Sequence, residues 1–172
     1  MEEIEAKFLE INVKVIVKKL DSMGADIVYE GDIEAFYYDF PDNRISEGKM
    51  LLRLRKKNGF SELTFKKKIS NEKLKIMDEY EVEVEDFDEM QRIIESLGMI
   101  CTNTSKKHRI SYSLGDVHFE LDTFSGIPTF LEIEANKPEM IEEYALKLGL
   151  SMKDAKPWTG KKVVEHYAKR NT

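Results

Sequence analysis

Charged side chains recur at alternating positions in several short segments of this 172-residue sequence. The pattern is clear in Glu3-x-Glu5-x-Lys7, in Arg53-x-Arg55 and in Lys107-x-Arg109. Side chains two positions apart lie on the same face of a β-strand, so each segment commits one face of a strand to ions. The other members of the set are Lys66, Lys68, Glu79, Glu81, Glu83, Glu120, Asp122, Glu132 and Glu134.

The two signs of charge suit different ligands. Arg makes forked contacts to phosphate and Lys supplies a point charge, so the basic positions suit a multidentate phosphate group. Clustered Asp and Glu without paired Cys or His suit hard cations such as Mg²⁺, Mn²⁺ or Ca²⁺. A polyphosphate bridged by a metal ion uses both sets, and the pattern predicts this ligand chemistry.

The elements that carry these residues are predicted to form one domain over residues 1–172. Period-2 alternation predicts about eight strands, over residues 3–8, 27–38, 51–55, 62–66, 79–84, 107–112, 117–122 and 130–134. Helical periodicity bounded by Gly or Pro predicts helices over residues 12–23, 86–97, 138–148 and 160–169. Short turn signals between the strands favour antiparallel hairpins, so the predicted class is α+β.

The strand faces opposite the ions are apolar, as in Leu52 and Leu54 or in Tyr80, Val82 and Val84, and we expect helices to cover them. Two architectures satisfy this pattern. In the first, an open sheet packs its apolar face on helices and exposes its ions to water. In the second, the sheet closes into an eight-stranded tunnel-like β-barrel with helices outside and ions lining a wet bore. Burying unpaired ions costs on the order of several kcal/mol each, so such a bore must pair its charges, stay wet or hold a ligand with metal.

Composition argues against several classes of function. The net charge of −6 and the isoelectric point near 5.3 argue against nucleic-acid or anionic-membrane partners, which require a cationic surface. The single Cys101 allows neither an intramolecular disulfide nor a metal site of the Cys-pair type. The N-terminus is acidic and apolar runs are short, so we expect no signal peptide, no membrane span and a cytoplasmic location.

The order of these motifs resembles that of the CYTH superfamily, named for class IV adenylyl cyclases and thiamine triphosphatases and also called triphosphate tunnel metalloenzymes. Glu3-x-Glu5-x-Lys7 is similar to the E-x-E-x-K signature of the family. The other charged segments follow in the family's order over roughly residues 1–150. The resemblance implies a tunnel-like antiparallel barrel with helices outside, and it favours the closed architecture.

The resemblance also implies roles for individual residues. The triphosphate would be bound by Lys7, Arg53, Arg55, Lys66, Lys68, Lys107 and Arg109. Mg²⁺ or Mn²⁺, as one or two ions, would be held by Glu3, Glu5, Glu81, Glu83, Asp122, Glu132 and Glu134. Catalysis would be carried by Glu5, Lys7, Arg109, Glu132 and Glu134. Where the family often has an Arg, this chain has Met77 and Asp78, so that phosphate contact is either missing or supplied by Lys68, Lys73 or Lys75.

Three functions fit this interpretation. The first is a divalent-metal-dependent enzyme that converts ATP to cyclic AMP and pyrophosphate, like a class IV adenylyl cyclase. The second is a triphosphatase that hydrolyses inorganic tripolyphosphate, thiamine triphosphate or a nucleoside triphosphate. The third is a module that binds a phosphorylated ligand without turnover. The expected partner is a triphosphate-containing small molecule, with no nucleic acid and no membrane, and pairing as a homodimer is left open.

Overall fold

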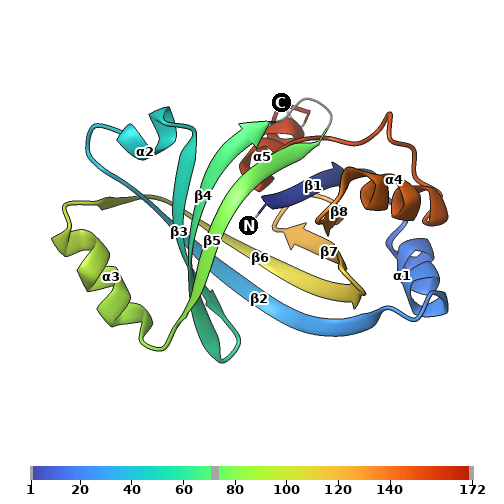
Figure 1. Cartoon of the computed structure of the whole chain (residues 1–172), viewed down its shortest axis with the longest axis horizontal. Coiled ribbons are helices and arrows are strands. Elements are labelled where there is room, and N and C mark those ends of the chain that lie inside the picture. Colours follow the sequence, from blue (N-terminus) through green and yellow to red (C-terminus); the bar gives the residue numbers. More distant parts are fainter. Residues whose placement is uncertain (1, 71–73, 171–172) are drawn as a thin grey trace.

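A closed antiparallel β-barrel of eight strands forms the centre of the molecule (Figure 1). The computed structural model describes residues 2–70 and 74–170. The strands are β1 (Glu2–Phe8), β2 (Asp26–Asp39), β3 (Met50–Lys57), β4 (Phe60–Ser70), β5 (Lys75–Val84), β6 (Ile100–Leu114), β7 (Val117–Phe124) and β8 (Phe130–Ala135). Their order around the barrel is β1-β5-β4-β3-β2-β6-β7-β8, and β8 pairs with β1 to close it. The predicted barrel is therefore confirmed.

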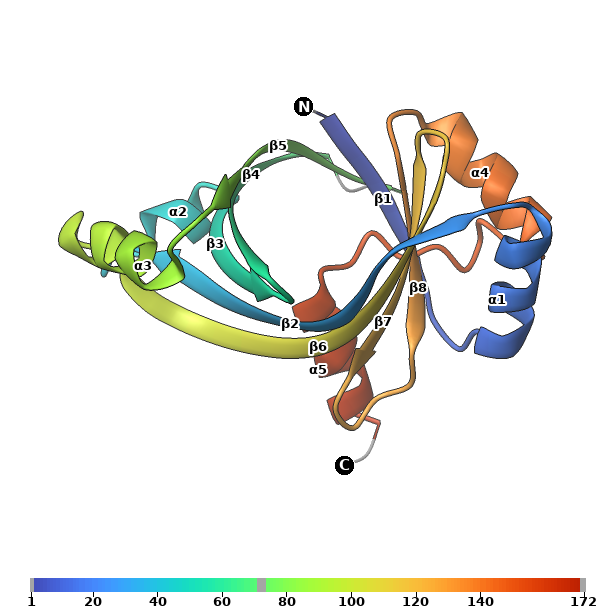
Figure 2. The same ribbon diagram turned by 90° about the horizontal axis from the view of Figure 1, so that it is seen from below.

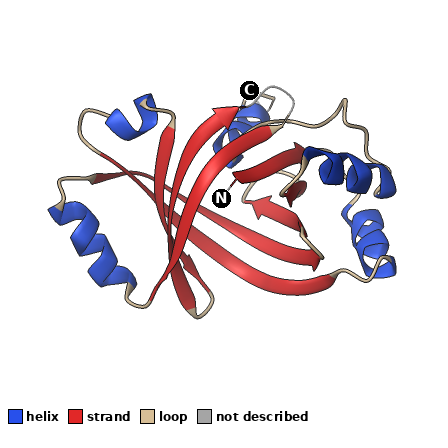
Figure 3. Ribbon diagram, in the orientation of Figure 1, coloured by secondary structure: helices blue, strands red, loops and turns tan. Residues whose placement is uncertain are grey.

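The helices all pack outside this barrel, as the sequence predicts (Figure 3). They are α1 (Val13–Ser22), α2 (Arg44–Glu47), α3 (Phe87–Ser96), α4 (Pro138–Lys147) and α5 (Gly160–Ala168). In Figure 2 the strands curve around a common axis, with α3 on one side of the molecule and α1 and α4 on the other. The long helices lie within one or two residues of their predicted bounds. Among the described residues, no helix is both long and apolar enough to cross a membrane.

Three apolar clusters attach the helices to the outer faces and one end of the barrel. The largest joins α1 and α4 to the outer faces of β1, β7 and β8, and includes Ile16, Leu20 and Ile141. A second joins α3 to β2, β3 and the end of β5. In the third, α5 packs on Phe130 and Phe124, at the ends of β8 and β7. Because the helices bury one face of these strands, the opposite faces are directed toward the barrel axis.

The prediction that helices cover every apolar strand face is wrong for most of β5. The side chains of Tyr80 and Val82 are 61% and 57% exposed, whereas Val84 is buried beside α3. Figure 1 shows β4 and β5 in front with no helix across them. α3 reaches only the end of β5 and Ile76 packs on the largest cluster at the other end, so Tyr80 and Val82 between them are left in contact with solvent.

The short helix α2 was not expected, because four residues are too few to show a helical period. It is held by the buried carboxylate of Asp39, which accepts the backbone N–H groups of Ile45 and Ser46 at 2.9 Å each. These hydrogen bonds lower the pKa of Asp39 although burial opposes the shift. The segment between β2 and β3 is thus fixed by one side chain at the end of β2.

Candidate active site in the barrel interior

The charged faces of the strands point toward the barrel axis and meet one another there. The strand registers place Lys7 opposite Glu132 and Arg109 opposite Asp122. Residues directly opposite on antiparallel strands share a face of the sheet, so their side chains can contact each other. Ion pairs join several of them into one network, which we call the inner cluster: Glu5, Lys7, Lys107, Arg109, Asp122 and Glu132.

Lys7 is the most deeply enclosed cation of the inner cluster. Its Nζ lies 2.5 Å from Glu5 Oε1 and also contacts Glu132, and the side chain is only 4% exposed. Its main chain is fixed by two hydrogen bonds with Lys156, of 3.0 and 2.8 Å. Burial would lower the pKa of Lys7, but Glu132 and Glu5 outweigh burial and raise it. Lys7 is therefore a permanent cation between two carboxylates.

Arg109 makes the second anchor of the inner cluster. Its Nε and Nη2 donate to the two oxygens of Asp122 at 2.6 Å each, and Nη2 lies 3.4 Å from Glu132 Oε1. Burial opposes ionisation of Asp122 and Glu132, but the neighbouring cations outweigh it and lower the pKa of both carboxyls. Lys107 lies 2.6 Å from Asp122, yet burial and Arg109 lower the pKa of Lys107 to about 8. Lys107 is thus the weakest cation of the network.

A second set of ion pairs lies beside the inner cluster, on β1, β4 and β5. Lys66 contacts Glu3, and its Nζ lies 3.1 Å from Glu79. Lys75 lies 3.1 Å from Glu5 Oε1, which joins this set to Lys7. Lys75 therefore supplies a cation in the barrel interior near the position where the family often has an Arg, whereas Lys73 lies outside the described residues.

Glu134 differs from the other carboxyl groups of the interior. No ion pair joins it within the described part of the chain, although it lies opposite Glu5 on β1. Burial raises the pKa of Glu134 to about 8, and the nearby carboxylates of Glu3 and Glu132 act in the same direction. Glu134 is therefore largely protonated at neutral pH unless a further positive charge enters the site.

The donor set around Glu134 fits a hard divalent cation. Glu3, Glu5, Glu132 and Glu134 lie on the inner faces of β1 and β8, and repulsion by the first three carboxylates adds to burial in raising the pKa of Glu134. In residues 2–70 and 74–170, no three acidic, His or Cys side chains are already gathered tightly enough to hold an ion. Lys7 contacts Glu132, and Lys66 contacts Glu3. A cation would have to replace one of these ammonium groups.

The opposite wall of the barrel carries Arg53 and Arg55, which we call the arginine pair. Arg55 lies 2.7 Å from Glu62 and 2.8 Å from Glu81. Arg53 has no carboxylate partner among the described residues; its Nη2 donates to Thr64 Oγ1 at 3.3 Å, and its buried Nε has no partner. Burial and the adjacent Arg55 lower the pKa of Arg53. Arg53 therefore has unused capacity to bind an anion.

The structure does not bring every predicted site residue to one place. Glu81 is 37% exposed and is occupied by Arg55 and Thr64. Glu83 is exposed and lies opposite Glu62 in the strand register. Lys68 is partly buried near the bulge at the end of β4. The roles of Glu81 and Glu83 in metal binding, and of Lys68 in phosphate binding, stay predictions.

Sequence reasoning also missed interior residues. Glu62 pairs with Arg55 and with Lys57, and Ser111 donates to Glu120 at 2.5 Å. The signal was available, because Glu62 shares strand parity with Lys66, and Ser111 shares it with Arg109. Lone polar residues next to a conspicuous ion pair are easily overlooked, although they line the same bore.

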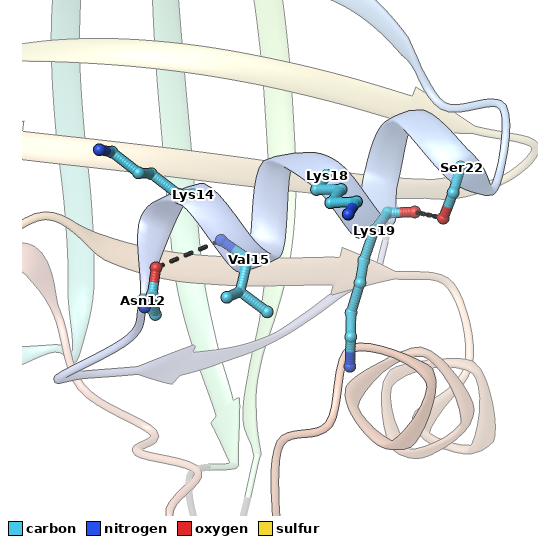
Figure 4. Close-up of a pocket in the computed structure, with 6 residues that line it drawn as sticks. All are labelled: Asn12, Lys14, Val15, Lys18, Lys19 and Ser22. Carbon is cyan, nitrogen blue, oxygen red and sulfur yellow. Dashed lines mark hydrogen bonds between the residues drawn. The ribbon is translucent and has the colours of Figure 1, made fainter.

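One surface hollow lies apart from this site, on α1. This hollow of about 590 Å³ follows the exposed side of the helix (Figure 4). Its lining residues are Asn12, Lys14, Val15, Lys18, Lys19 and Ser22. Asn12 accepts the backbone N–H of Val15 and caps the helix, and Lys19 reaches the carbonyl of Lys147. All lining residues come from one helix, so the hollow is a solvated helix face.

Comparison with known proteins identifies the class of this barrel. The model of the CYTH domain matches residues 1–156, so the chain belongs to the CYTH family. A protein of Methanocaldococcus jannaschii, whose name suggests an adenylate cyclase, is 27% identical over 140 residues, which cover 78% of this chain and 80% of that protein.

Solved structures agree with this assignment. The PH1012 protein of Pyrococcus horikoshii is 32% identical, with a TM-score of 0.76 over 91% of this chain and 96% of that one. A Hippeastrum protein is similar in fold, with a TM-score of 0.65 and 16% identity over 92% of this chain and 90% of its own. That protein is described as an adenylyl cyclase with a dominant triphosphatase activity. The family thus has adenylate cyclase-like and triphosphatase-like neighbours.

Proposed function

We propose that this protein is a divalent-metal-dependent enzyme that cleaves a triphosphate substrate inside the barrel. The observation that carries the proposal is the arrangement of both signs of charge around one axis. The inner cluster and Glu134 supply carboxylates, whereas Arg53 supplies a cation that has no carboxylate partner among the described residues. A structural barrel would gain more from apolar packing, because buried ion pairs add little net stability.

The residues of this chain would act mainly by binding and orientation. Arg53 and Arg55 would hold phosphate oxygens through N–H groups, and Lys107 would approach them as a point charge. Glu3, Glu5, Glu132 and Glu134 would hold Mg²⁺ or Mn²⁺, with Asp122 near enough to take part through the inner cluster. When bound, the ion would neutralise negative charge that builds up on the phosphate oxygens. Phosphoryl transfer needs no covalent intermediate on the protein, so positioning and charge suffice.

Two reactions use such a site. In cyclisation, the 3′-hydroxyl oxygen of ATP bonds to the α-phosphorus, the bond from that phosphorus to the bridging oxygen breaks, and pyrophosphate leaves. In hydrolysis, a water oxygen bonds to the terminal phosphorus, the bond from that phosphorus to its bridging oxygen breaks, and the diphosphate leaves while the water gives up a proton and orthophosphate forms. We place cyclisation first, on the name given to the Methanocaldococcus relative, and hydrolysis second, on the activity stated for the Hippeastrum protein.

Product analysis tests the proposal. The purified protein is incubated with Mg²⁺ or Mn²⁺ and with ATP, tripolyphosphate or thiamine triphosphate, and the products are separated. Cyclic AMP with pyrophosphate supports cyclisation, whereas orthophosphate supports hydrolysis. Arg53→Ala and Glu134→Gln are expected to abolish either product, and Glu34→Gln, on the outer face of β2, is the matched control. Tight binding with no product from any substrate would instead establish a non-catalytic binding module.

A further inference from the structure

The row of inner-facing cations on β3 does not end at the arginine pair. Lys57 follows Arg55 at the same strand parity, so its side chain leaves the strand on the same face as Arg53 and Arg55. That side chain is only 17% exposed. The phosphate-binding residues predicted from the sequence do not include Lys57, and it adds a third cation to this wall of the barrel.

Glu62, on β4, lies between Lys57 and Arg55. Its Oε1 is 2.5 Å from the Nζ of Lys57, and its Oε2 is 2.7 Å from the Nη2 of Arg55. Strand register places Glu62 directly opposite Arg55, and the side chain of Glu62 is only 10% exposed. One enclosed carboxylate thus neutralises two neighbouring cations, as a bound phosphate group would.

The contact between Glu62 and Arg55 is incomplete. The Oε2 of Glu62 and the Nε of Arg55 are both buried, and neither has a hydrogen-bond partner in the described structure. The two charges attract each other at 2.7 Å, but no aligned hydrogen bond forms between them. A buried donor without a partner costs free energy, and a phosphate group offers a guanidinium more acceptor oxygens than this single carboxylate oxygen does. A phosphate group is therefore a better partner for Arg55 than Glu62.

Both cations keep support from other groups when Glu62 is displaced. Arg55 also donates to Glu81, on β5, at 2.8 Å, and this bond fixes the guanidinium from its other side. The Nζ of Lys57 lies 5.1 Å from the centre of the Phe60 ring, within range of a cation–π contact. Burial and Arg55 lower the pKa of Lys57 although Glu62 opposes the shift, so a nearby anion favours the charged form of Lys57. A phosphate group between Lys57 and Arg55 would supply that anion.

We propose that Glu62 holds the place of a phosphate group in the free protein: it occupies Lys57 and Arg55, and the triphosphate must displace it to bind both. This inference rests on the proposed function and adds Lys57 to the residues that hold the phosphates. The displaced carboxylate loses its partners and repels the ligand, so Glu62 lowers the affinity that the cations of β3 would otherwise give. Glu62 is thus an internal competitor that sets how much triphosphate is needed to fill the site.

Calorimetric titration of inorganic tripolyphosphate into the whole protein, treated with EDTA, tests this competition. Glu62→Gln keeps the shape of the side chain and removes its charge, so it is expected to bind tripolyphosphate about tenfold more tightly than the wild type. Glu34→Gln, which removes a charge from the outer face of β2, is the matched control and is expected to stay within about twofold of the wild type. A gain in affinity separates competition from structural support, because a damaged site binds more weakly.

A second substitution tests whether Glu62 masks Lys57. In the wild type, the contact of Lys57 with the ligand is offset in part by the ion pair that Lys57 gives up, so Lys57→Gln is expected to weaken binding about threefold. In the Glu62→Gln background this offset is absent, and the loss is expected to reach about tenfold or more. Equal losses in the two backgrounds would show that Glu62 does not mask Lys57 and would overturn the inference.

The remaining outcomes separate this inference from the function on which it rests. If the wild type binds tripolyphosphate and Glu62→Gln binds it equally or more weakly, Glu62 does not compete with phosphate; the inference is overturned and the proposed function stands. If neither protein binds, both are refuted. If circular dichroism shows that Glu62→Gln is unfolded, NMR of the wild type decides. The ammonium resonance of Lys57, assigned through its absence in Lys57→Gln, is expected to shift when tripolyphosphate is added, and an unchanged resonance overturns the inference.

Discussion

The inner cluster and the arginine pair use similar residues in opposite ways. In the inner cluster, each cation is matched by carboxylates, as Lys7 is by Glu5 and Glu132. In the arginine pair, Arg55 pairs with Glu62 and Glu81 and Arg53 pairs with no carboxylate, while the buried Nε of each has no hydrogen-bond partner in the described structure. We propose from this difference that the two regions have separate tasks: the balanced network would keep carboxylates in place for a cation, and the arginine pair would bind an anion.

Among these variants, replacement of Glu132 is expected to lower the free energy of unfolding most. Glu132→Ala leaves Lys7 and Arg109 buried with fewer carboxylates, and a broken buried pair destabilises a protein by about 3–5 kcal/mol. Urea unfolding of the metal-free protein measures this loss. Glu143→Ala is the control, because its pair with Lys147 is exposed and its loss is expected to change stability far less. A similar loss in both variants would contradict the balance assigned to the inner cluster.

The pH dependence of metal binding tests whether Glu134 is a metal ligand. A carboxyl must lose its proton to bind a cation, and the pKa of Glu134 is about 8. Affinity for Mn²⁺ is therefore expected to rise between pH 6 and pH 8, by roughly fifty-fold if one proton is released. Calorimetric titration at several pH values measures the rise. Glu134→Gln is expected to bind Mn²⁺ more weakly at high pH and to lose most of the dependence.

The same pKa shift has a consequence for the metal-free fold. The folded protein keeps the proton of Glu134 up to about pH 8, whereas the unfolded chain releases it near its ordinary pKa of about 4.3. The folded state thus binds more protons between these pH values, so this group makes the free energy of unfolding fall as pH rises through that window. The fall should be smaller in Glu134→Gln, and an equal fall in both proteins would refute the assigned pKa.

Variants of the arginine pair separate the effect of ion pairing on stability from the effect of each arginine on ligand affinity. Arg53→Ala removes a cation with no carboxylate partner, so stability should change by less than about 1 kcal/mol. Tripolyphosphate binding should fall by about tenfold or more, because a hydrogen bond to a charged group contributes about 1.5–3 kcal/mol. Arg55→Ala should lose both affinity and stability, since Glu62 and Glu81 are left behind. If both variants changed stability and tripolyphosphate affinity by the same amounts, the proposed difference between Arg53 and Arg55 would be wrong.

The smallest effect is expected at the edge of the site. Glu81→Gln keeps the shape of a side chain that is 37% exposed and already bound by Arg55. Metal affinity is expected to change by less than about threefold, because the carboxylates near Glu134 lie on β1 and β8 rather than β5. If Glu81→Gln lost as much Mn²⁺ affinity as Glu134→Gln in the same titration, Glu81 would be a metal ligand and this prediction would be wrong.

The sequence alone could predict which charged side chains share a strand face, because strand alternation is a local property. The pattern of Glu3, Glu5 and Lys7 is enough to place these side chains on one face of β1. It cannot say that Arg55 pairs with Glu62 and Glu81 while Arg53 pairs with neither, since partners depend on the register between strands.

Other features depend on context that no local pattern contains. The alternation in β5 predicts that a helix covers Tyr80 and Val82. Their exposure depends instead on where α3 ends against β5. The sequence shows that charged and uncharged residues alternate along β2, but only the register between β2 and β3 shows that Tyr37 lies opposite Arg53. Helix α2 exists through the capping of its N–H groups by Asp39 rather than through its own propensity.

The most direct test of the division between the two regions is a calorimetric titration of tripolyphosphate with and without Mg²⁺. The wild type is predicted to bind more tightly when Mg²⁺ is present. Arg53→Ala should weaken binding in both conditions, whereas Glu134→Gln should lose mainly the gain due to Mg²⁺. Affinities of both variants equal to those of Glu34→Gln in both conditions would contradict the account, because neither region would then contact the ligand.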